Sequence, residues 1–252
     1  WINELYINKK KYAEAEKIFT EKKSISTWKR LILFKYNFNI DFLYPEVSFG
    51  DDYFPNDLNT KITKKEIFID GGGWIGDTTD IFLSKYKKYK NIFIYEPGKF
   101  AISKLKGKYN KSKKIKIKKA AVGKEKTFVN FYDTRDPSST EIRKSYQKPY
   151  KVKVLPIDDL GLKNENITIK LNVEGSEKNA LLGAKRTIRT NNTNLIICLN
   201  HRPSDIVDLI KHVRSLGKKF KYYLRSHDYG ITQLVLYAID QERNSKRLNK
   251  YQ

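Results

Sequence analysis

The sequence predicts a doubly wound α/β domain that ends in an antiparallel hairpin and is preceded by a helical extension. Three observations predict this fold class. From residue 66 onwards, short apolar runs alternate with amphipathic segments, which is typical of a parallel sheet with helices on both faces. The last two runs, at 220–224 and 231–239, are joined by a short loop, as in a hairpin. Residues 1–39 instead show helical spacing of their apolar side chains.

We expect three parts along the chain: a helical extension over residues 1–50, the α/β domain over residues 51–240 and a charged tail over residues 241–252. The extension should contain two helices that end near Asn39. The segment that follows is rich in turn residues. Its aromatic stretch at 51–55 is expected to anchor against the core.

The first βαβ unit is predicted at residues 66–96. A buried strand is followed by a glycine turn, a helix from Asp77 and a second strand at 91–95. A glycine turn at the end of a strand lets a ligand approach the backbone, and an acid after the second strand, here Glu96, can bind a ribose diol. Small residues after the third strand leave room for a flat ring. The predicted cofactor-binding residues are Asp70, Gly71, Gly73, Gly76, Thr78, Glu96 and Ala121.

The rest of the chain continues the alternation of strands and helices and supplies further polar strand ends. The elements expected after Glu96 are a helix to Tyr109, strands at 115–122, 128–132 and 152–155, a polar loop at 133–140, a turn at 157–160, a central strand at 167–174, a helix from Ser176, a strand at 195–199, and a helix from Pro203 to Gly217. Because the carboxyl ends of parallel strands meet at one edge of a sheet, we expect the residues there to share a site with the glycine turn.

The candidate catalytic residues are His201, Glu174 and Asn172. His201 follows a predicted strand and can titrate near neutrality, so it is the candidate general base; the alternative is a structural histidine that binds a loop. Asn172 and Glu174 are two apart on a predicted strand and therefore share a face. With His201 they form a possible ligand set for Mg²⁺ or Mn²⁺. Glu174 alternatively caps the following helix.

Loops over the same edge supply candidate substrate-binding residues. Arg202, Arg225 and His227 suit a phosphate group on the substrate. Ser138 and Ser139 lie in the polar loop and are candidates for hydrogen bonds to the cofactor or the substrate.

The composition limits the partners. The chain has 51 basic and 28 acidic residues and a net charge of +23, which suits nucleic acid, an anionic membrane surface or an anionic small molecule. Of the 51 basic residues 10 are Arg, which leaves 51 − 10 = 41 Lys. Arginine serves base recognition better, and we find no nucleic-acid-binding motif, so nucleic acid is the less favoured partner. No apolar stretch is long enough to span a membrane, and the oligomeric state stays open.

A single cysteine, Cys198, lies in a predicted apolar strand. It has no second cysteine in the sequence to pair with, which favours a reducing, cytoplasmic environment. We expect a buried structural thiol at this position.

The pattern of Gly71, Gly73 and Gly76 admits either a nicotinamide dinucleotide or S-adenosylmethionine. Two features favour the second. An antiparallel last strand is typical of the Rossmann-like sheet of class I methyltransferases. Asp70 can bind the ammonium group of a methionine, whereas it would repel a pyrophosphate.

The sequence resembles the FkbM family of S-adenosylmethionine-dependent methyltransferases. The matching segments cover residues 51–239 and are DDYFP, EIFIDGGGWIGDTT, IFIYEP, AAVG, the serine pair in DPSST, IDDL, IKLNVEGSEKNALLGAKRTI, HRPSD, KYYLRSHDYG and LVLYAI. The resemblance implies O-methyl transfer, usually to a sugar hydroxyl of a bacterial glycan or natural product. The family usually has an acid where this chain has Asn172, which puts the metal site and an acid-assisted base in doubt.

Three functions follow as hypotheses. The first is a cytoplasmic O-methyltransferase that acts on a sugar or nucleotide-activated sugar for a bacterial surface polysaccharide. The second is a nucleic-acid methyltransferase, suggested by the charge. The third is a non-catalytic interaction module with a methyltransferase fold, in which Asn172 marks lost chemistry.

Overall fold

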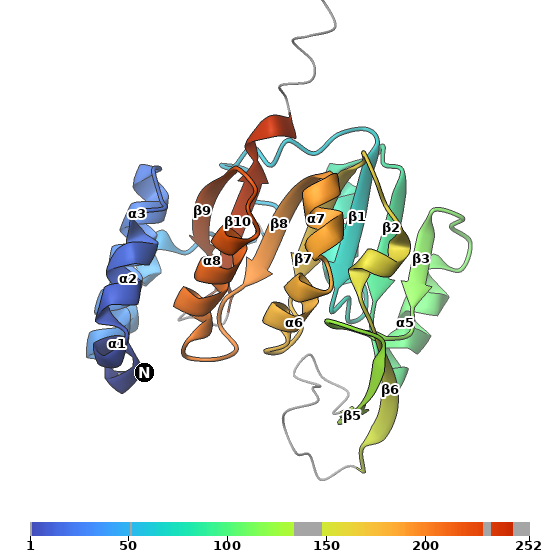
Figure 1. Ribbon diagram of the computed structural model, residues 1–252, viewed down its shortest axis with the longest axis horizontal. Helices are drawn as coiled ribbons and strands as arrows, with labels where there is room; N and C mark the ends of the chain where they lie inside the picture. Colours follow the sequence, from blue (N-terminus) through green and yellow to red (C-terminus); the bar gives the residue numbers. More distant parts are fainter. Residues whose placement is uncertain (1, 51, 134–147, 229–232, 244–252) are drawn as a thin grey trace, which may run out of the picture. The chain divides into compact units, whose positions relative to one another are not determined.

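The computed structural model describes residues 2–50, 52–133, 148–228 and 233–243 (Figure 1). These residues form two compact units. One unit joins Trp1–Thr60 to Asn194–Gln252, and the other consists of Lys61–Thr193. We refer to them as the terminal unit and the central unit.

The central unit contains four parallel strands in the order β3 (Ile115–Lys118), β2 (Asn91–Tyr95), β1 (Glu66–Gly71) and β7 (Asn166–Leu171). Every residue of β1 is buried, as expected for a strand with helices on both faces. Within this unit α6 (Glu177–Leu182) and α7 (Lys185–Thr190) lie over the near face of the strands, and α5 (Lys99–Tyr109) lies behind them (Figure 1). The helix α4 (Asp77–Lys85) connects β1 to β2.

A second, three-stranded sheet in the central unit differs from the sequence-based prediction. The chain leaves the main sheet after Lys118, where the amide of Ala120 bonds to the carbonyl of Lys118 at 2.8 Å. The predicted strand at 115–122 is therefore two strands, and β4 (Ala121–Val122) joins β6 (Tyr150–Leu155) and β5 (Thr127–Phe131) in the order β4-β6-β5. The one-turn helix η3 (Ile157–Leu160) follows β6.

The segment after β7 corrects a second prediction. The strand ends at Leu171, because Glu174 and Gly175 have φ values of 51° and 95° and form a left-handed turn. Asn172 and Glu174 therefore do not share the face of a strand. The single helix expected from Ser176 is divided into α6 and α7.

The terminal unit contains the predicted antiparallel hairpin. β10 (Leu234–Asp240) pairs with β9 (Phe220–Ser226) on one side and with β8 (Asn192–Cys198) on the other, antiparallel in both cases. The helix α8 (Asp205–Ser215) connects β8 to β9. Cys198 is buried, as predicted.

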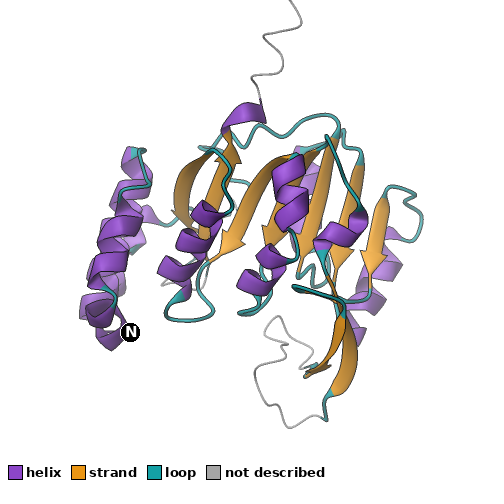
Figure 2. Ribbon diagram, in the orientation of Figure 1, coloured by secondary structure: helices purple, strands orange, loops and turns teal. Residues whose placement is uncertain are grey.

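All strands of the main sheet follow the order β3-β2-β1-β7-β8-β10-β9. Figure 2 shows the alternation of helices and strands along the chain. The fold class predicted from the sequence is confirmed.

The N-terminal helices belong to the terminal unit and pack there against β9. There are three of them instead of two, α1 (Ile2–Ile7), α2 (Lys9–Glu16) and α3 (Lys22–Asn37), followed by the short helices η1 (Ile40–Phe42) and η2 (Tyr44–Glu46). Trp28 is fully buried, and its ring lies 5.6 Å from the rings of Tyr12 and Phe19. Phe19 also forms a bridge with Tyr222 of β9. The contacts therefore divide the chain differently from the predicted boundary at residue 50.

Two smaller expectations also have an outcome. Tyr53 and Phe54 are 4% and 1% exposed, so the aromatic stretch before the central unit does anchor in the core. No helix among the described residues is both long and apolar enough to cross a membrane.

Candidate active site

The carboxyl ends of three parallel strands meet at one edge of the central unit. Gly71 of β1 pairs with Tyr95 of β2 and with Leu171 of β7. The residue directly after β1 is Gly72, the one after β2 is Glu96 and the one after β7 is Asn172. The amide of Gly72 bonds to the carbonyl of Tyr95 at 3.0 Å, and the amide of Asn172 bonds to the carbonyl of Gly71 at 3.1 Å. The sequence-based expectation that the glycine turn, Glu96 and Asn172 meet is confirmed.

Two glycines of the turn are required by its geometry. Gly72 has φ +75°, and a Cβ atom there would overlap the carbonyl oxygen of Asn172. Gly76 has φ +88°, and its Cβ would lie 2.6 Å from the hydroxyl of Tyr109. Side chains rarely adopt such φ values. The pattern found in the sequence used Gly71 and Gly73 and missed Gly72.

Asp70 is an interior residue that holds the turn. It is 0% exposed. Its Oδ1 atom lies 3.0 Å from Nζ of Lys170, and its Oδ2 atom accepts a 2.8 Å hydrogen bond from the hydroxyl of Thr79. Burial raises the pKa of Asp70, and the charge of Lys170 opposes this. Because both oxygens are engaged and enclosed, the predicted contact of Asp70 with a ligand ammonium gains no support.

Lys170 is a site-forming residue that the sequence reasoning missed. It lies opposite Asp70 in the pairing of β1 and β7 and is 2% exposed. Its Nζ atom also donates to the carbonyl of Gly72 at 2.8 Å. One ammonium group thus links the end of β1 to the glycine turn. A lysine in the middle of an apolar strand was the available signal, since buried lysines are rare unless paired.

Glu96 clamps the turn to the second strand. Its Oε2 atom accepts a 2.9 Å hydrogen bond from the amide of Trp74, and Oε1 accepts a 2.7 Å bond from the amide of Gly98. Burial raises the pKa of Glu96 to about 7 against the opposing effect of these two amides. Each carboxylate oxygen can accept a second hydrogen bond, and Glu96 is 6% exposed.

Trp74 is a second residue that the sequence reasoning missed. It has φ +41°, and such backbone strain in a residue other than glycine is often found at functional sites. Its ring lies 5.8 Å from that of Phe100, which is 37% exposed. The turn therefore has an aromatic pair beside it.

The helix that follows the turn is acidic at its start. Gly76 is the N-cap of α4, and Asp77 and Asp80 occupy the first turn. Negative side chains at a helix N-terminus compete with bound phosphate for the helix dipole. Thr78, predicted to bind the cofactor, is 1% exposed, so its side chain is enclosed and not available to a ligand.

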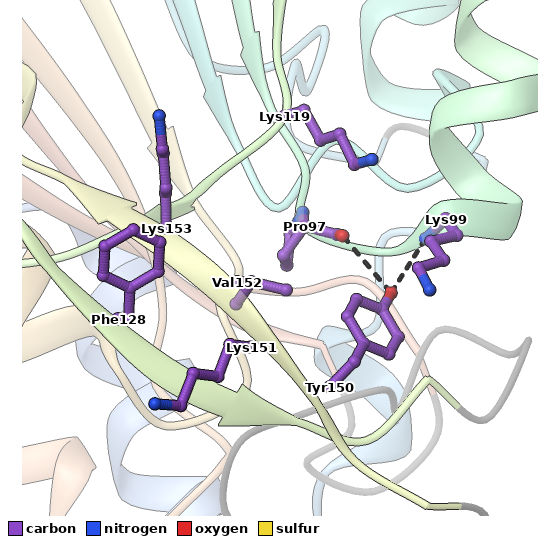
Figure 3. Close-up of a pocket in the computed structure, with 8 residues that line it drawn as sticks. All are labelled: Pro97, Lys99, Lys119, Phe128, Tyr150, Lys151, Val152 and Lys153. Carbon is purple, nitrogen blue, oxygen red and sulfur yellow. Dashed lines mark hydrogen bonds between the residues drawn. The ribbon is translucent and has the colours of Figure 1, made fainter.

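An open depression of about 420 Å³ lies beside the residue that follows Glu96 (Figure 3). Its lining residues are Pro97, Lys99, Lys119, Phe128, Tyr150, Lys151, Val152 and Lys153. Ala121, a predicted cofactor-binding residue, lies on β4 two positions after the lining residue Lys119 and is half-buried. The predicted contacts of Ser138 and Ser139 lie outside the described residues.

The candidate catalytic residues are divided between the two units. Asn172 and Glu174 lie in the loop after β7. The carboxylate of Glu177 accepts a 2.8 Å hydrogen bond from the amide of Val173 in this loop. His201 belongs to the terminal unit and is half-buried. Its role as a base, and the metal site with Asn172 and Glu174, stay predictions.

Two predicted substrate-binding residues are interior residues of the terminal unit, which corrects the prediction. Arg225 belongs to β9 and is 0% exposed. His227 is 3% exposed, and its Nε2 atom lies 2.6 Å from the hydroxyl of Tyr237. Arg202 is exposed just before α8, where its amide bonds to Asp205 at 2.9 Å. Of the three residues, Arg202 alone remains a candidate for substrate binding.

Arg225 instead joins the N-terminal helices to the hairpin. Its Nη1 and Nη2 atoms bond to the two carboxylate oxygens of Glu21 at 2.8 and 2.9 Å, and its Nε atom lies 3.2 Å from Asp57. Burial acts to raise the pKa of Glu21, but the hydrogen bonds from Arg225 and Ser24 outweigh it and hold the pKa below its ordinary value. The guanidinium is thus a structural cation.

We expect Arg225→Met to destabilise the fold by about 2–3 kcal/mol, because it leaves the half-buried carboxylate of Glu21 without its cation. Chemical denaturation of the variant measures this loss. Lys23→Met is the matched control, since Lys23 pairs with Asp57 at 2.7 Å and both side chains are more than a third exposed to solvent, at 35% and 40%. This substitution should cost less than about 1 kcal/mol. Equal losses in the two variants would contradict the structural role.

The sheet order, the antiparallel last strand and the glycine turn clamped by an acid define a Rossmann-like protein of the methyltransferase type. The chain belongs to the FkbM family, because the model of the methyltransferase FkbM domain matches residues 70–229. A search of curated proteins finds no match.

One solved structure shows the same fold, and two others are more distantly similar. The methyltransferase FkbM from Methylobacillus flagellatus KT has a TM-score of 0.81 and 22% sequence identity, over 94% of this chain. This chain spans 60% of the length of that protein. More distant is an rRNA methylase from Streptococcus thermophilus, with a TM-score of 0.43 and 10% identity over 71% of this chain and 90% of its own. Fibrillarin from Aeropyrum pernix, solved with bound S-adenosyl-L-methionine, has a TM-score of 0.42 and 12% identity over 71% and 69%.

The match with the Methylobacillus protein, which covers 94% of this chain, extends into the N-terminal helices. The part of this chain outside the match with the Methylobacillus protein is about 15 of 252 residues, which is fewer than the first 50. The structural likeness therefore includes most of the helical segment, which the resemblance in sequence left out.

Proposed function

We propose that the chain is an S-adenosylmethionine-dependent O-methyltransferase that acts on a sugar hydroxyl in the cytoplasm, for a bacterial surface polysaccharide. The observation that carries the proposal is the Glu96 clamp. Its carboxylate holds the amides of Trp74 and Gly98 at the edge of the sheet, and each of its oxygens can accept a second hydrogen bond.

The residues at this edge fit S-adenosylmethionine better than a dinucleotide. The two hydroxyls of a ribose match the two carboxylate oxygens of Glu96. Asp77 in the first turn of α4 would repel a pyrophosphate and suit a sulfonium cation, whereas Asp80 pairs with Lys108 at 2.6 Å. Gly72 and Gly76 remove side chains where the backbone has to turn.

When bound, the cofactor supplies an electrophilic methyl group for in-line displacement. The task of the chain is then to orient both reactants and to accept the proton of the hydroxyl. Glu96 and the turn orient the adenosine, and His201 is the proposed base. Asn172 lies beside Gly72 at the edge, where its amide is proposed to bond to the substrate. The proposed ligands of a divalent metal remain Asn172, Glu174 and His201.

Isothermal titration with S-adenosylmethionine and S-adenosylhomocysteine tests the cofactor. Binding at micromolar concentration is the expected result, and its absence at millimolar ligand contradicts the proposal. A screen of nucleotide-activated sugars with a labelled methyl donor, with and without Mg²⁺ or Mn²⁺, then tests the substrate and the metal.

Cofactor affinity should depend on pH through Glu96. A diol donates to the ionised carboxylate, whose pKa is raised by burial to about 7. The affinity for S-adenosylhomocysteine should therefore be constant above this pKa and fall by about tenfold per pH unit below it. The free energy of unfolding depends on pH in the opposite direction. Without ligand, the folded state favours the protonated form of Glu96, so the fold becomes less stable as the pH rises from the ordinary pKa of a glutamate to the raised pKa. Titration calorimetry at several pH values measures the first effect.

Glu96→Gln is the control for this pH dependence. Glutamine does not ionise, and one of its two terminal atoms becomes a donor that faces a backbone amide. The variant should bind more weakly, and its affinity should not change in the same pH range. A pH dependence that survives in Glu96→Gln would assign the effect to another group.

Methylation of nucleic acid is the second candidate, favoured by the net charge of +23. It predicts binding to RNA or DNA that weakens steeply with salt. Binding that is absent or insensitive to salt would remove it.

The third hypothesis is a non-catalytic module, and Asn172 distinguishes it. Asn172→Asp restores the acid that is usual in the family. Turnover that appears only in this variant would favour a chain that has lost its chemistry, whereas turnover in the wild-type chain excludes this hypothesis.

A further inference from the structure

The depression beside Pro97 has a basic rim and an apolar floor. In Figure 3 the side chains of Val152 and Tyr150 project towards Pro97, and Lys151 and Lys153 extend from the other side of β6. This alternation is expected along a strand. The depression therefore combines two kinds of surface within one small volume.

Four lysines are among the residues that line the depression. Lys151 and Lys153 come from β6, Lys99 is the first residue of α5, and Lys119 follows β3. All four residues are exposed. Within the part of the chain that the structure describes, none of them has an ion-pair partner, and no acid lines the depression. Lysines are common on this chain, but these four line one depression, and charges of one sign along a concave surface add to its potential.

An acid beside the depression, Asp133, has hydrogen-bond partners of its own. Asp133 is 9% exposed, and its Oδ2 atom accepts hydrogen bonds from the amide of Lys99 at 2.8 Å and from the hydroxyl of Tyr150 at 2.9 Å. The Nζ atom of Lys99 lies 4.1 Å from the centre of the Tyr150 ring. These contacts fix Tyr150 in the floor, and among the described residues no ion pair joins Asp133 to any of the four lysines.

The depression also has an exposed aromatic ring. Phe128 is 60% exposed and lies directly opposite Lys153 in the pairing of β5 and β6. Side chains of a paired position lie on the same face of the sheet. A ring beside an ammonium group suits a flat base that carries phosphate, because the base stacks while the lysines neutralise the charge.

S-adenosylmethionine does not account for this rim, since its sulfonium is positive and would be repelled by four ammonium groups. We propose that the depression binds the nucleoside diphosphate part of a nucleotide-activated sugar, with Phe128 against the base and the lysines around the diphosphate. This inference rests on the proposed function and names the class of its acceptor. In this proposal the phosphate groups bind at the depression and not at the interior residues Arg225 and His227.

The test is a titration of the full chain with uridine diphosphate, with uridine and a short RNA as comparison ligands. The variants are Lys151→Ser/Lys153→Ser and Phe128→Ser, all at exposed positions. The matched control is Lys111→Ser/Lys113→Ser, which removes the same charge from exposed residues beyond the other end of α5. Binding of S-adenosylhomocysteine is measured in every variant.

We expect uridine diphosphate to bind the wild-type chain more tightly than uridine does. The double lysine variant should lose at least about tenfold in affinity, as for charge-assisted contacts, and Phe128→Ser about fivefold or more, as for a lost stacking contact. The control should change less than about twofold, as for screened surface charges. The affinity for S-adenosylhomocysteine should be the same in all variants.

Four results would overturn the inference. The first is no binding of uridine diphosphate, and the second is an equal loss in the double lysine variant and its control. The third is competition with S-adenosylhomocysteine, which would assign the depression to the cofactor. The fourth is RNA binding that is tighter and lost in the same variants, which would assign it to nucleic acid. Absence of S-adenosylhomocysteine binding to the wild-type chain would instead remove the proposed function, and this inference with it.

Discussion

Replacing Gly72 by alanine is expected to disrupt the glycine turn and to abolish cofactor binding. The new Cβ would overlap the carbonyl oxygen of Asn172, which belongs to the backbone and cannot rotate away. The residue would also have to keep φ +75°, which disfavours any side chain. We expect a loss of about 3 kcal/mol or more in the free energy of unfolding, measured by denaturation. Titration with S-adenosylhomocysteine should show no binding.

Gly161→Ala separates the effect of the overlap from that of the φ value. Gly161 lies in the same unit, has φ +63°, and has no atom within 4 Å of the position of a Cβ. Its substitution should therefore cost only the backbone strain, about 1 kcal/mol, and leave cofactor affinity unchanged. If both variants lost the same stability, the contact with Asn172 would not be the cause.

Lys170→Met should have the second large effect. The substitution leaves the buried carboxylate of Asp70 without its cation and the carbonyl of Gly72 without its 2.8 Å hydrogen bond. Removing one partner of a buried pair costs about 3–5 kcal/mol. Because the ammonium group also holds the turn, we expect cofactor affinity to fall together with stability. Denaturation and titration calorimetry measure the two losses.

The double variant Asp70→Asn/Lys170→Met tests the origin of this loss. It removes both charges, so the uncompensated carboxylate no longer exists. We expect it to be more stable than Lys170→Met alone, with a coupling energy of about 1–3 kcal/mol between the two sites. Cofactor affinity should not return, since the bond to Gly72 is still missing. Additive losses would show that the pair contributes little.

The sequence by itself determined the order of elements and one edge of the site. Apolar runs and helical spacing depend on local burial, so β1, β2 and the hairpin were predictable. Glu96 was found because an acid one residue beyond a buried strand has a defined place at the edge of a parallel sheet. The family resemblance added the reaction class and marked Asn172 as unusual.

Only the tertiary structure decided which glycine and which charges matter. The motif fits only Gly71, Gly73 and Gly76, and it passes over Gly72, whose importance comes from its contact with Asn172 in the loop after β7. Arg225 reads as a loop residue, but β9 extends through Ser226 and buries it against Glu21 and Asp57. Nothing in the sequence around Lys170 indicates that its partner is Asp70.

The physical reason is the distance along the chain between partners. Periodicity and capping are properties of neighbouring residues, and they predict elements. Burial of a charge depends on what packs against it, and Lys170 reaches Asp70 across 100 residues of sequence. Local patterns therefore locate the edge of the glycine turn and Glu96, whereas the pairing of strands determines which of its side chains face a ligand and which hold the turn in place.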